Sequence, residues 1–257
     1  MTYLHFENSS VAIDLGELVS FIHGDHEFIH QKGSPGWGSS DTEMFPIIGP
    51  VNEAGFRVQV GKGNAIQDQH GHLRQMQYKL VSSTTSSATY RKEYKAGTAV
   101  KNSKFPEKST EEWLTWPYSF QFEKSFNLTA NQLEITFKIS GEKDMPFMLG
   151  YHPAFKLYLE NPIIVAGELE ISLNQVLEVG SRALSVENCE SITLKDKKEI
   201  SLTTEGFGNF MCWTEVPNMV CIEPISFYPY TVAQDQLHQG FHLLTEEPQV
   251  FKVTLKV

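Results

Sequence analysis

Two short apolar stretches each contain one ionisable residue followed directly by a proline. LGYHPAFKL (149–157) contains His152, and MVCIEPISF (219–227) contains Glu223. A proline disfavours helical backbone at the residue before it, so both side chains are expected to stand on extended backbone. Such rigid positions suit a preorganised proton donor and acceptor. A core histidine bonded to a backbone carbonyl and an edge-strand glutamate facing water are the structural alternatives.

Two further stretches combine glycine with polar side chains. DQHGHLRQMQY (68–78) places His70 and Arg74 close together around Gly71. A neutral donor/acceptor beside a fixed cation suits hydrogen bonding to sugar hydroxyls, whereas a turn with solvated side chains explains the same residues. Residues 27–52 have a Gly/Ser/Pro-rich middle followed by an apolar run, which predicts a loop feeding a buried strand.

An apolar period of two dominates the chain. In QLEITFKIS (132–140) apolar and polar residues alternate, which is typical of a half-buried strand. SFQFEKSFNL (119–128) is its expected partner, with a hairpin turn at TANQ (129–132). Further strands are expected at 56–61, 168–173, 190–204 and 251–257.

No segment keeps a helical apolar period for three turns, so helix should be minor and the fold an antiparallel sandwich or barrel. Residues 95–112 are rich in Lys, Ser and Glu and are predicted to form a long surface loop. Because strand character is the same on both sides of that loop, we expect residues 1–257 to form a single domain.

Composition excludes several classes of partner. A net charge of −10 argues against binding nucleic acid or an acidic membrane face, because both require clustered Lys and Arg. The beginning lacks a secretory signal pattern, and no apolar run approaches the roughly 18 residues of a membrane helix. We therefore expect a soluble, cytoplasmic protein that binds a small molecule.

A metal site is not expected from the sequence. The three cysteines are odd in number and contain no CxxC pair, which argues against a disulfide framework or a zinc knuckle. His23, His26 and His30 lie close together in HGDHEFIH, but on a strand His23 would face away from the other two, and no acidic or Cys partner set is evident.

Four motifs, in order along the chain, resemble those of the aldose 1-epimerases, or mutarotases. These are EMFPIIG (43–49) followed by Asn52, HGHLR (70–74), YHPAF (151–155) and CIEP (221–224). The resemblance implies an all-β, antiparallel, galactose-mutarotase-like β-supersandwich with little helix. It also implies interconversion of α and β anomers of a sugar without a cofactor.

The resemblance assigns a role to each candidate residue. Glu223 would be the base that takes the proton of the anomeric hydroxyl, and His152 the acid that protonates the ring oxygen. His70 and Arg74 would bind the sugar, and its apolar face would be lined by Phe155 and Trp213. We expect the polar residues to converge on one cleft, with His152 and Glu223 facing each other across a gap of ring width.

The sequence also departs from the family pattern. Pro50 stands where many relatives have a substrate-binding Arg, His72 replaces the aromatic residue of HGF, and Ile225 replaces a frequent Trp. A preference for galactose therefore does not carry over. The alternatives are a non-catalytic carbohydrate-binding or sensing protein and a mutarotase of phosphorylated sugars. The second needs extra cations near the cleft, and the supply nearest in sequence is Arg57, Arg74, Arg91 and Lys92.

Overall fold

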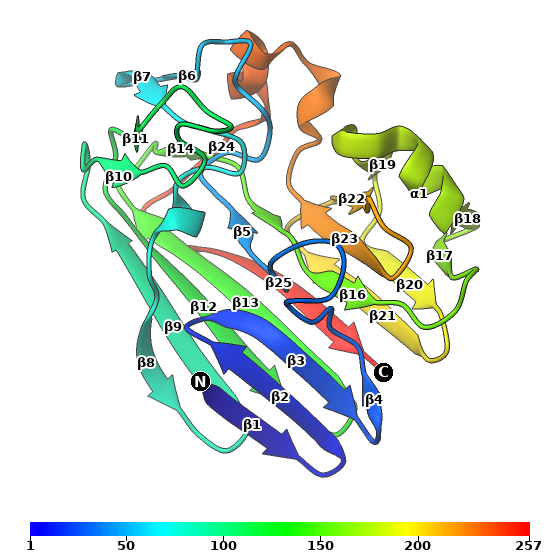
Figure 1. The fold of residues 1–257 in the computed structure, drawn as a ribbon. Coiled ribbons are helices and arrows are strands. Elements are labelled where there is room, and N and C mark those ends of the chain that lie inside the picture. The colour runs from blue at the N-terminus through cyan, green and yellow to red at the C-terminus, as the bar shows by residue number, and fades with distance from the viewer.

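Antiparallel sheets make up most of the protein (Figure 1), whose computed structural model describes residues 1–257. The largest sheet has nine strands in the order β18 (Leu169–Ser172), β17 (Ile163–Ala166), β20 (Ser191–Lys195), β21 (Glu199–Glu205), β25 (Gln249–Lys256), β13 (Gln132–Gly141), β12 (Phe120–Leu128), β9 (Ser87–Tyr94) and β8 (Lys79–Ser83). All strands predicted in this sheet are present. The strand expected at 56–61 forms β6 (Arg57–Val60), which belongs to a separate two-stranded sheet.

A six-stranded sheet and a four-stranded sheet lie over different parts of the nine-stranded sheet (Figure 1). The six-stranded sheet contains β19 (Leu184–Val186), β22 (Asn209–Trp213), β23 (Met219–Ile225), β15 (Gly150–Tyr151) and β5 (Glu43–Met44), and β16 (Ala154–Lys156) also pairs with β23. The four-stranded sheet contains β1 (Thr2–Phe6), β2 (Ser9–Asp14), β3 (Glu17–His23) and β4 (His26–Glu27). Two-stranded sheets pair β6 (Arg57–Val60) with β7 (Gly63–Ile66), β10 (Val100–Lys101) with β11 (Trp113–Leu114), and β14 (Pro146–Phe147) with β24 (His242–Leu243).

Helix is minor, as the sequence predicts. The only α-helix is α1 (Leu173–Val179), which begins with a capping box between Ser172 and Gln175. Short 3₁₀ helices are η1 (Leu73–Gln75), η2 (Gly180–Arg182), η3 (Pro229–Thr231) and η4 (Gln234–Gly240). None of these helices has the length and apolar character needed to cross a membrane.

The β12–β13 hairpin shows how the alternating sequence builds the core. Its register runs from Leu128 opposite Leu133 to Phe120 opposite Gly141, so the predicted hairpin is confirmed. The apolar set of each strand points to one face and is buried. The main core cluster contains buried residues from almost the whole length of the chain, from Leu4 to Leu255. The expectation that residues 1–257 form a single domain stays a prediction.

One buried position on β12 is charged. Lys124 lies among the phenylalanines of that strand and is fully buried. Its Nζ is 2.7 Å from Asp41 Oδ2 and 2.7 Å from Glu43 Oε1. The Tyr151 hydroxyl also donates to Asp41 Oδ2 at 2.7 Å.

Lys92 on β9 is a second buried cation next to this group. Its Nζ is 3.7 Å from Glu43 Oε2 and donates to the Leu73 carbonyl at 2.9 Å. We call Asp41, Glu43, Lys92 and Lys124 the buried charge cluster. It has two positive and two negative members, and it ties the nine-stranded sheet to β5 of the six-stranded sheet.

Replacing Lys124 with Met is expected to lower the free energy of unfolding by about 3–5 kcal/mol, because two buried carboxylates lose their main counter-charge. Denaturant unfolding of both proteins at pH 7 measures this difference. The matched control is Lys138→Met at an exposed position of the neighbouring strand β13, for which a change within about 0.5 kcal/mol is expected. Equal effects of the two substitutions would contradict a stabilising role for the cluster.

Candidate active site

A cleft of about 480 Å³ opens on the six-stranded sheet and is lined by 23 residues, within the size range of small-molecule sites. Strands β22 and β23 supply part of its wall through alternation. Met211 and Trp213 on β22 and Glu223 on β23 line the cleft. Neighbouring residues such as Phe210 and Ile222 are buried in the main core. Most of the remaining lining comes from loops and short 3₁₀ helices far apart in the sequence.

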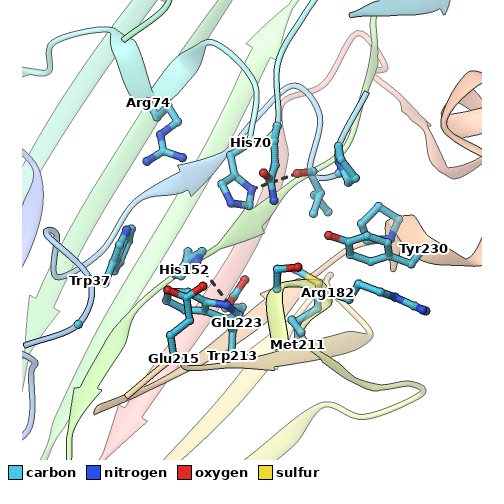
Figure 2. Close-up of a pocket in the computed structure, with 18 of the residues that line it drawn as sticks. Trp37, His70, Arg74, His152, Arg182, Met211, Trp213, Glu215, Glu223 and Tyr230 are labelled. Atoms are coloured by element: carbon cyan, nitrogen blue, oxygen red, sulfur yellow. Dashed lines mark hydrogen bonds and ion pairs between the residues drawn. The ribbon is translucent and has the colours of Figure 1, made fainter. Parts of the chain in front are cut away.

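His152 and Glu223 meet in this cleft (Figure 2), with His152 Nε2 3.4 Å from Glu223 Oε1. Both side chains are buried, and neither His152 Nδ1 nor Glu223 Oε1 has a hydrogen-bond partner. Buried polar atoms are normally satisfied, so these two atoms indicate a site built for a ligand. No backbone carbonyl of another residue holds the His152 ring, in contrast to the structural alternative for this histidine.

The expected gap of ring width between these two residues is wrong, and strand register explains why. Gly150 pairs with Ile225 and Ala154 pairs with Cys221, which places His152 directly opposite Glu223. Cross-strand neighbours have Cβ atoms about 4.5–5.5 Å apart, so their side chains touch. The two groups therefore lie side by side and present their polar atoms to the same part of the cleft.

Burial drives the pKa values of the pair in opposite directions. Burial, together with the nearby Arg74 charge, lowers the pKa of His152 to about 3. Burial raises the pKa of Glu223 well above its usual range. Both effects have the same cause, because an apolar environment disfavours the charged form of either group. In the empty cleft these shifts favour the neutral form of each group, so a proton of the pair resides preferentially on the carboxyl group.

The backbone of His152 is fixed to the segment that carries two of the buried charges. Its N–H donates to the Thr42 carbonyl at 2.8 Å, and its carbonyl accepts from the Thr42 N–H at 3.2 Å. Thr42 lies between Asp41 and Glu43 of the buried charge cluster. On the cleft side, the Trp37 ring packs on the imidazole with centroids 4.3 Å apart.

His70 enters the same cleft with a defined tautomer. Its Nδ1 is 3.0 Å from the Ile48 carbonyl, which only accepts, so Nδ1 carries the proton and Nε2 is left as an acceptor. Burial lowers the pKa of His70 well below its usual range, and the ring is therefore neutral. The following Gly71 is required here, because a Cβ would lie 2.1 Å from the Phe45 carbonyl oxygen and φ is +68°.

The structure brings five of the six predicted site residues to the cleft. His70, Arg74, His152, Trp213 and Glu223 line it, and Figure 2 shows all five around one hollow. Phe155 is elsewhere: it is fully buried in the main core and pairs with Val220 of β23. It lies three positions after His152, and an odd spacing on extended chain turns a side chain to the opposite face.

The three departures from the family pattern have different positions. Pro50 lines the cleft and offers no donor there. His72 is buried with its ring 4.4 Å from that of Tyr94, and burial together with Lys92 lowers its pKa to about 3. It therefore acts as a neutral aromatic core residue. Ile225 is also fully buried and does not line the cleft.

Sequence reasoning missed several residues of the cleft. Trp37 lies in the stretch predicted to be only a loop, and its one signal is a Trp between two glycines. Of the cations expected nearby, Arg74 lines the cleft. Arg57 pairs with Glu111 at 3.6 Å, Arg91 with Glu123 at 2.8 Å, and Lys92 belongs to the buried charge cluster. Other charged or phenolic groups line the cleft instead, namely Lys104, Lys108, Arg182, Glu215 and Tyr230.

One trio has donor types that could hold a metal, and two of its members, His152 and Glu223, line the cleft. The ligand atoms of His152, Cys221 and Glu223 lie within 4.8 Å of one another. Burial raises the pKa of the Cys221 thiol well above its usual range, and a protonated thiol is a poor ligand. The expectation of no metal site stays a prediction.

Comparison with known proteins gives a consistent result. The aldose 1-epimerase family model matches residues 50–212. The fold is similar to a galactose mutarotase-like protein from Lactobacillus casei ATCC 334, with 17% identity, a TM-score of 0.81, and coverage of 100% of this chain and 99% of that one. It is also similar to a galactose mutarotase related enzyme from Lactobacillus acidophilus, with 19% identity, a TM-score of 0.77 and coverage of 99% and 96%.

A third similar structure is a galactose mutarotase-like protein from Clostridium acetobutylicum, with 14% identity, a TM-score of 0.68, and coverage of 98% of this chain and 93% of that one. At these identities the similarity establishes the galactose mutarotase-like fold. Comparison with curated protein sequences gives no significant match.

The His152 imidazole is expected to remain neutral at about pH 5, because its pKa lies near 3. Nitrogen-15 NMR of the histidine rings, with His152→Gln used to assign the signal, measures its protonation directly. Since the folded pKa is below the ordinary value of 6.5, neutral burial contributes stability above pH 6.5 that is lost as the pH falls toward 3. An imidazolium signal for His152 in the empty protein at pH 5 would contradict this assignment.

Proposed function

Because the chain belongs to the aldose 1-epimerase family, we propose that it interconverts the α and β anomers of an aldose or sugar derivative by acid/base ring opening, without a cofactor. The observation that carries the proposal is the buried pair of His152 and Glu223, whose polar atoms lie 3.4 Å apart in a sugar-sized cleft. A pair that holds one proton can take a proton at one atom and deliver one at another.

The side-by-side arrangement suits the two oxygens of an anomeric centre. The anomeric hydroxyl and the ring oxygen are both bonded to C1, so an adjacent base and acid reach both from one side. Glu223 as carboxylate takes the hydroxyl proton while His152 as imidazolium protonates the ring oxygen. The C1–O5 bond breaks, the hydroxyl oxygen becomes the aldehyde oxygen, and the chain rotates about C1–C2.

Ring closure reverses both roles. After opening, Glu223 is protonated and His152 is neutral, which is also the state that burial favours in the empty cleft. His152 takes the proton of the C5 hydroxyl as that oxygen attacks C1, and Glu223 returns a proton to the aldehyde oxygen. The proton count of the pair is therefore unchanged over the cycle, and each positioned transfer contributes about 10²–10⁴-fold.

The other cleft residues bind and orient the sugar. His70 Nε2 accepts from a sugar hydroxyl, because Nδ1 is committed to the Ile48 carbonyl. Arg74 lies near His152 and makes no ion pair within the protein, so its guanidinium donates to the substrate. Trp37 and Trp213 add apolar surface beside the imidazole, the Trp37 ring tilted over it at 4.3 Å between centroids and the Trp213 ring in an edge-to-face arrangement at 6.0 Å. A non-catalytic sugar-binding protein would share these contacts but not turnover.

Glu223→Gln is expected to lower kcat by about 10²–10⁴-fold with little change in KM, because the base acts mainly in the transition state. His152→Ala should behave similarly, and the double variant should cost less than the two single losses combined. NMR exchange between the anomeric signals of several aldoses measures the rates after subtraction of spontaneous mutarotation. His5→Ala, at an exposed position on β1, is the control and should keep the wild-type kcat.

The two possible failures of this experiment have different meanings. Wild-type kcat in His152→Ala, on a sugar shown to bind, would leave His152 as a structural residue. Binding of sugars by the wild-type protein without any exchange above background would favour the non-catalytic alternative.

The pH dependence of kcat/KM provides an independent test of the one-proton pair. Activity is expected to stay constant from about pH 6 to about pH 5 and to fall at higher pH, once the pair loses its proton. The sign follows from the raised pKa of Glu223 and the pKa of about 3 for His152, which bracket the one-proton state. A lone carboxylate base with a raised pKa would instead lose about tenfold in activity per pH unit on the acidic side.

A further inference from the structure

One wall of the cleft gathers three cations. Arg74 lies on η1, and Lys104 and Lys108 come from the loop before β11. The Lys108 N–H donates to the Lys104 carbonyl at 2.8 Å, so one turn of chain carries both lysines to the cleft. We call Arg74, Lys104 and Lys108 the basic wall.

The basic wall has an excess of positive charge. Lys104 Nζ is 2.9 Å from Asp68 Oδ1, and Asn102 donates to the other oxygen of that carboxylate at 2.9 Å. Arg74 and Lys108 have no carboxylate within ion-pair distance. Three cations thus share one anion, an excess of two positive charges in a chain whose net charge is −10.

The cations also act on one another. Burial lowers the pKa of Lys104, Asp68 opposes that change, and the Arg74 and Lys108 charges lower the pKa further. Such repulsion inside a cleft is relieved when an anion binds between the charges. Of the two carboxylates that line the cleft, Glu215 lies apart from Arg74 in Figure 2, and Glu223 Oε1 lies 3.4 Å from His152 Nε2.

Arg182 is a cation at another part of the cleft, away from the basic wall. The Arg182 guanidinium lies over the Tyr230 ring, 5.5 Å from its centroid, and Figure 2 shows it across the His152–Glu223 pair from Arg74. A single cation on an aromatic face offers one charge and less geometric definition than the basic wall. The stronger anion site is therefore beside Arg74.

We propose that the basic wall binds the phosphoryl group of a phosphorylated aldose, an inference that rests on the proposed function. The phosphate ester must be on a carbon other than C1, because ring opening requires a free anomeric hydroxyl. A phosphate ester carries about −1.5 to −2 charges at pH 7, which matches the excess of two positive charges, whereas a sugar carboxylate carries only −1. Arg74 connects the two functions, since it belongs to the basic wall and also lies near His152.

The test compares anomer exchange of glucose 6-phosphate, galactose 6-phosphate and mannose 6-phosphate with the three free sugars and with glucuronate, each corrected for its spontaneous rate. We expect kcat/KM to be about tenfold or more higher for at least one phosphate ester than for its free sugar. A hydrogen bond to a charged group contributes free energy of this size. Lys108→Glu should lower that ratio about tenfold, because it replaces an exposed cation of the wall with an anion. Lys101→Glu, an exposed lysine outside the cleft on β10, makes the same charge change and should leave the ratio unaltered.

Thermal stabilisation by the same compounds separates this inference from the proposed function, since binding to the folded state raises Tm without turnover. Stabilisation by a sugar phosphate that Lys108→Glu removes, in the absence of exchange, would support the basic wall and overturn the proposed catalysis. Exchange of free sugars as fast as of their phosphates, unaffected by Lys108→Glu, would overturn the basic wall alone. Preference for glucuronate would overturn the assignment to a phosphoryl group, and so would absence of stabilisation by every phosphate ester.

Discussion

The cleft depends on an ion cluster that lies outside it. Lys124 on the nine-stranded sheet meets Asp41 and Glu43 out of water, at 2.7 Å from each carboxylate. Removing charges from water is expensive, so this arrangement is stable only when partners of both signs are held together. Thr42, between the two carboxylates, exchanges both backbone hydrogen bonds with His152. The position of the imidazole is thus tied to the contact between two sheets.

In the cleft itself, burial shifts pKa values instead of strengthening ion pairs. His152 and Glu223 are also buried, but His152 Nδ1 and Glu223 Oε1 lack hydrogen-bond partners. The cost of removing these groups from water is therefore not offset by ion pairs, as it is in the buried charge cluster. Burial lowers the pKa of His152 and raises that of Glu223, which favours the neutral form of each group. Unsatisfied buried groups reduce stability, and they persist here because the surrounding strands fix their geometry. The basic wall around Arg74 is a second place in the cleft where groups lack partners, because its three cations have only one paired carboxylate.

Much of the fold follows from local pattern. The alternation in residues 119–141 is enough to predict a hairpin, because one face of each strand must be apolar. The same rule separates Phe155 from His152, since their odd spacing turns them to opposite faces of extended chain. Lys124 is the position where pattern alone misleads, because it occupies an apolar face and its partners lie about 80 residues earlier in the chain.

By itself the sequence determined the strands, the scarcity of helix, and the motifs that carry His70, His152 and Glu223, all of which depend on neighbours along the chain. Tertiary structure decided what these residues touch. The register of β23 against β15 and β16 sets His152 beside Glu223, and loops without periodicity bring Trp37 and the basic wall to the same cleft. Periodicity reports which face of an element is apolar, whereas the path of a loop is fixed by distant hydrogen bonds and charges that leave no repeating signal in the chain.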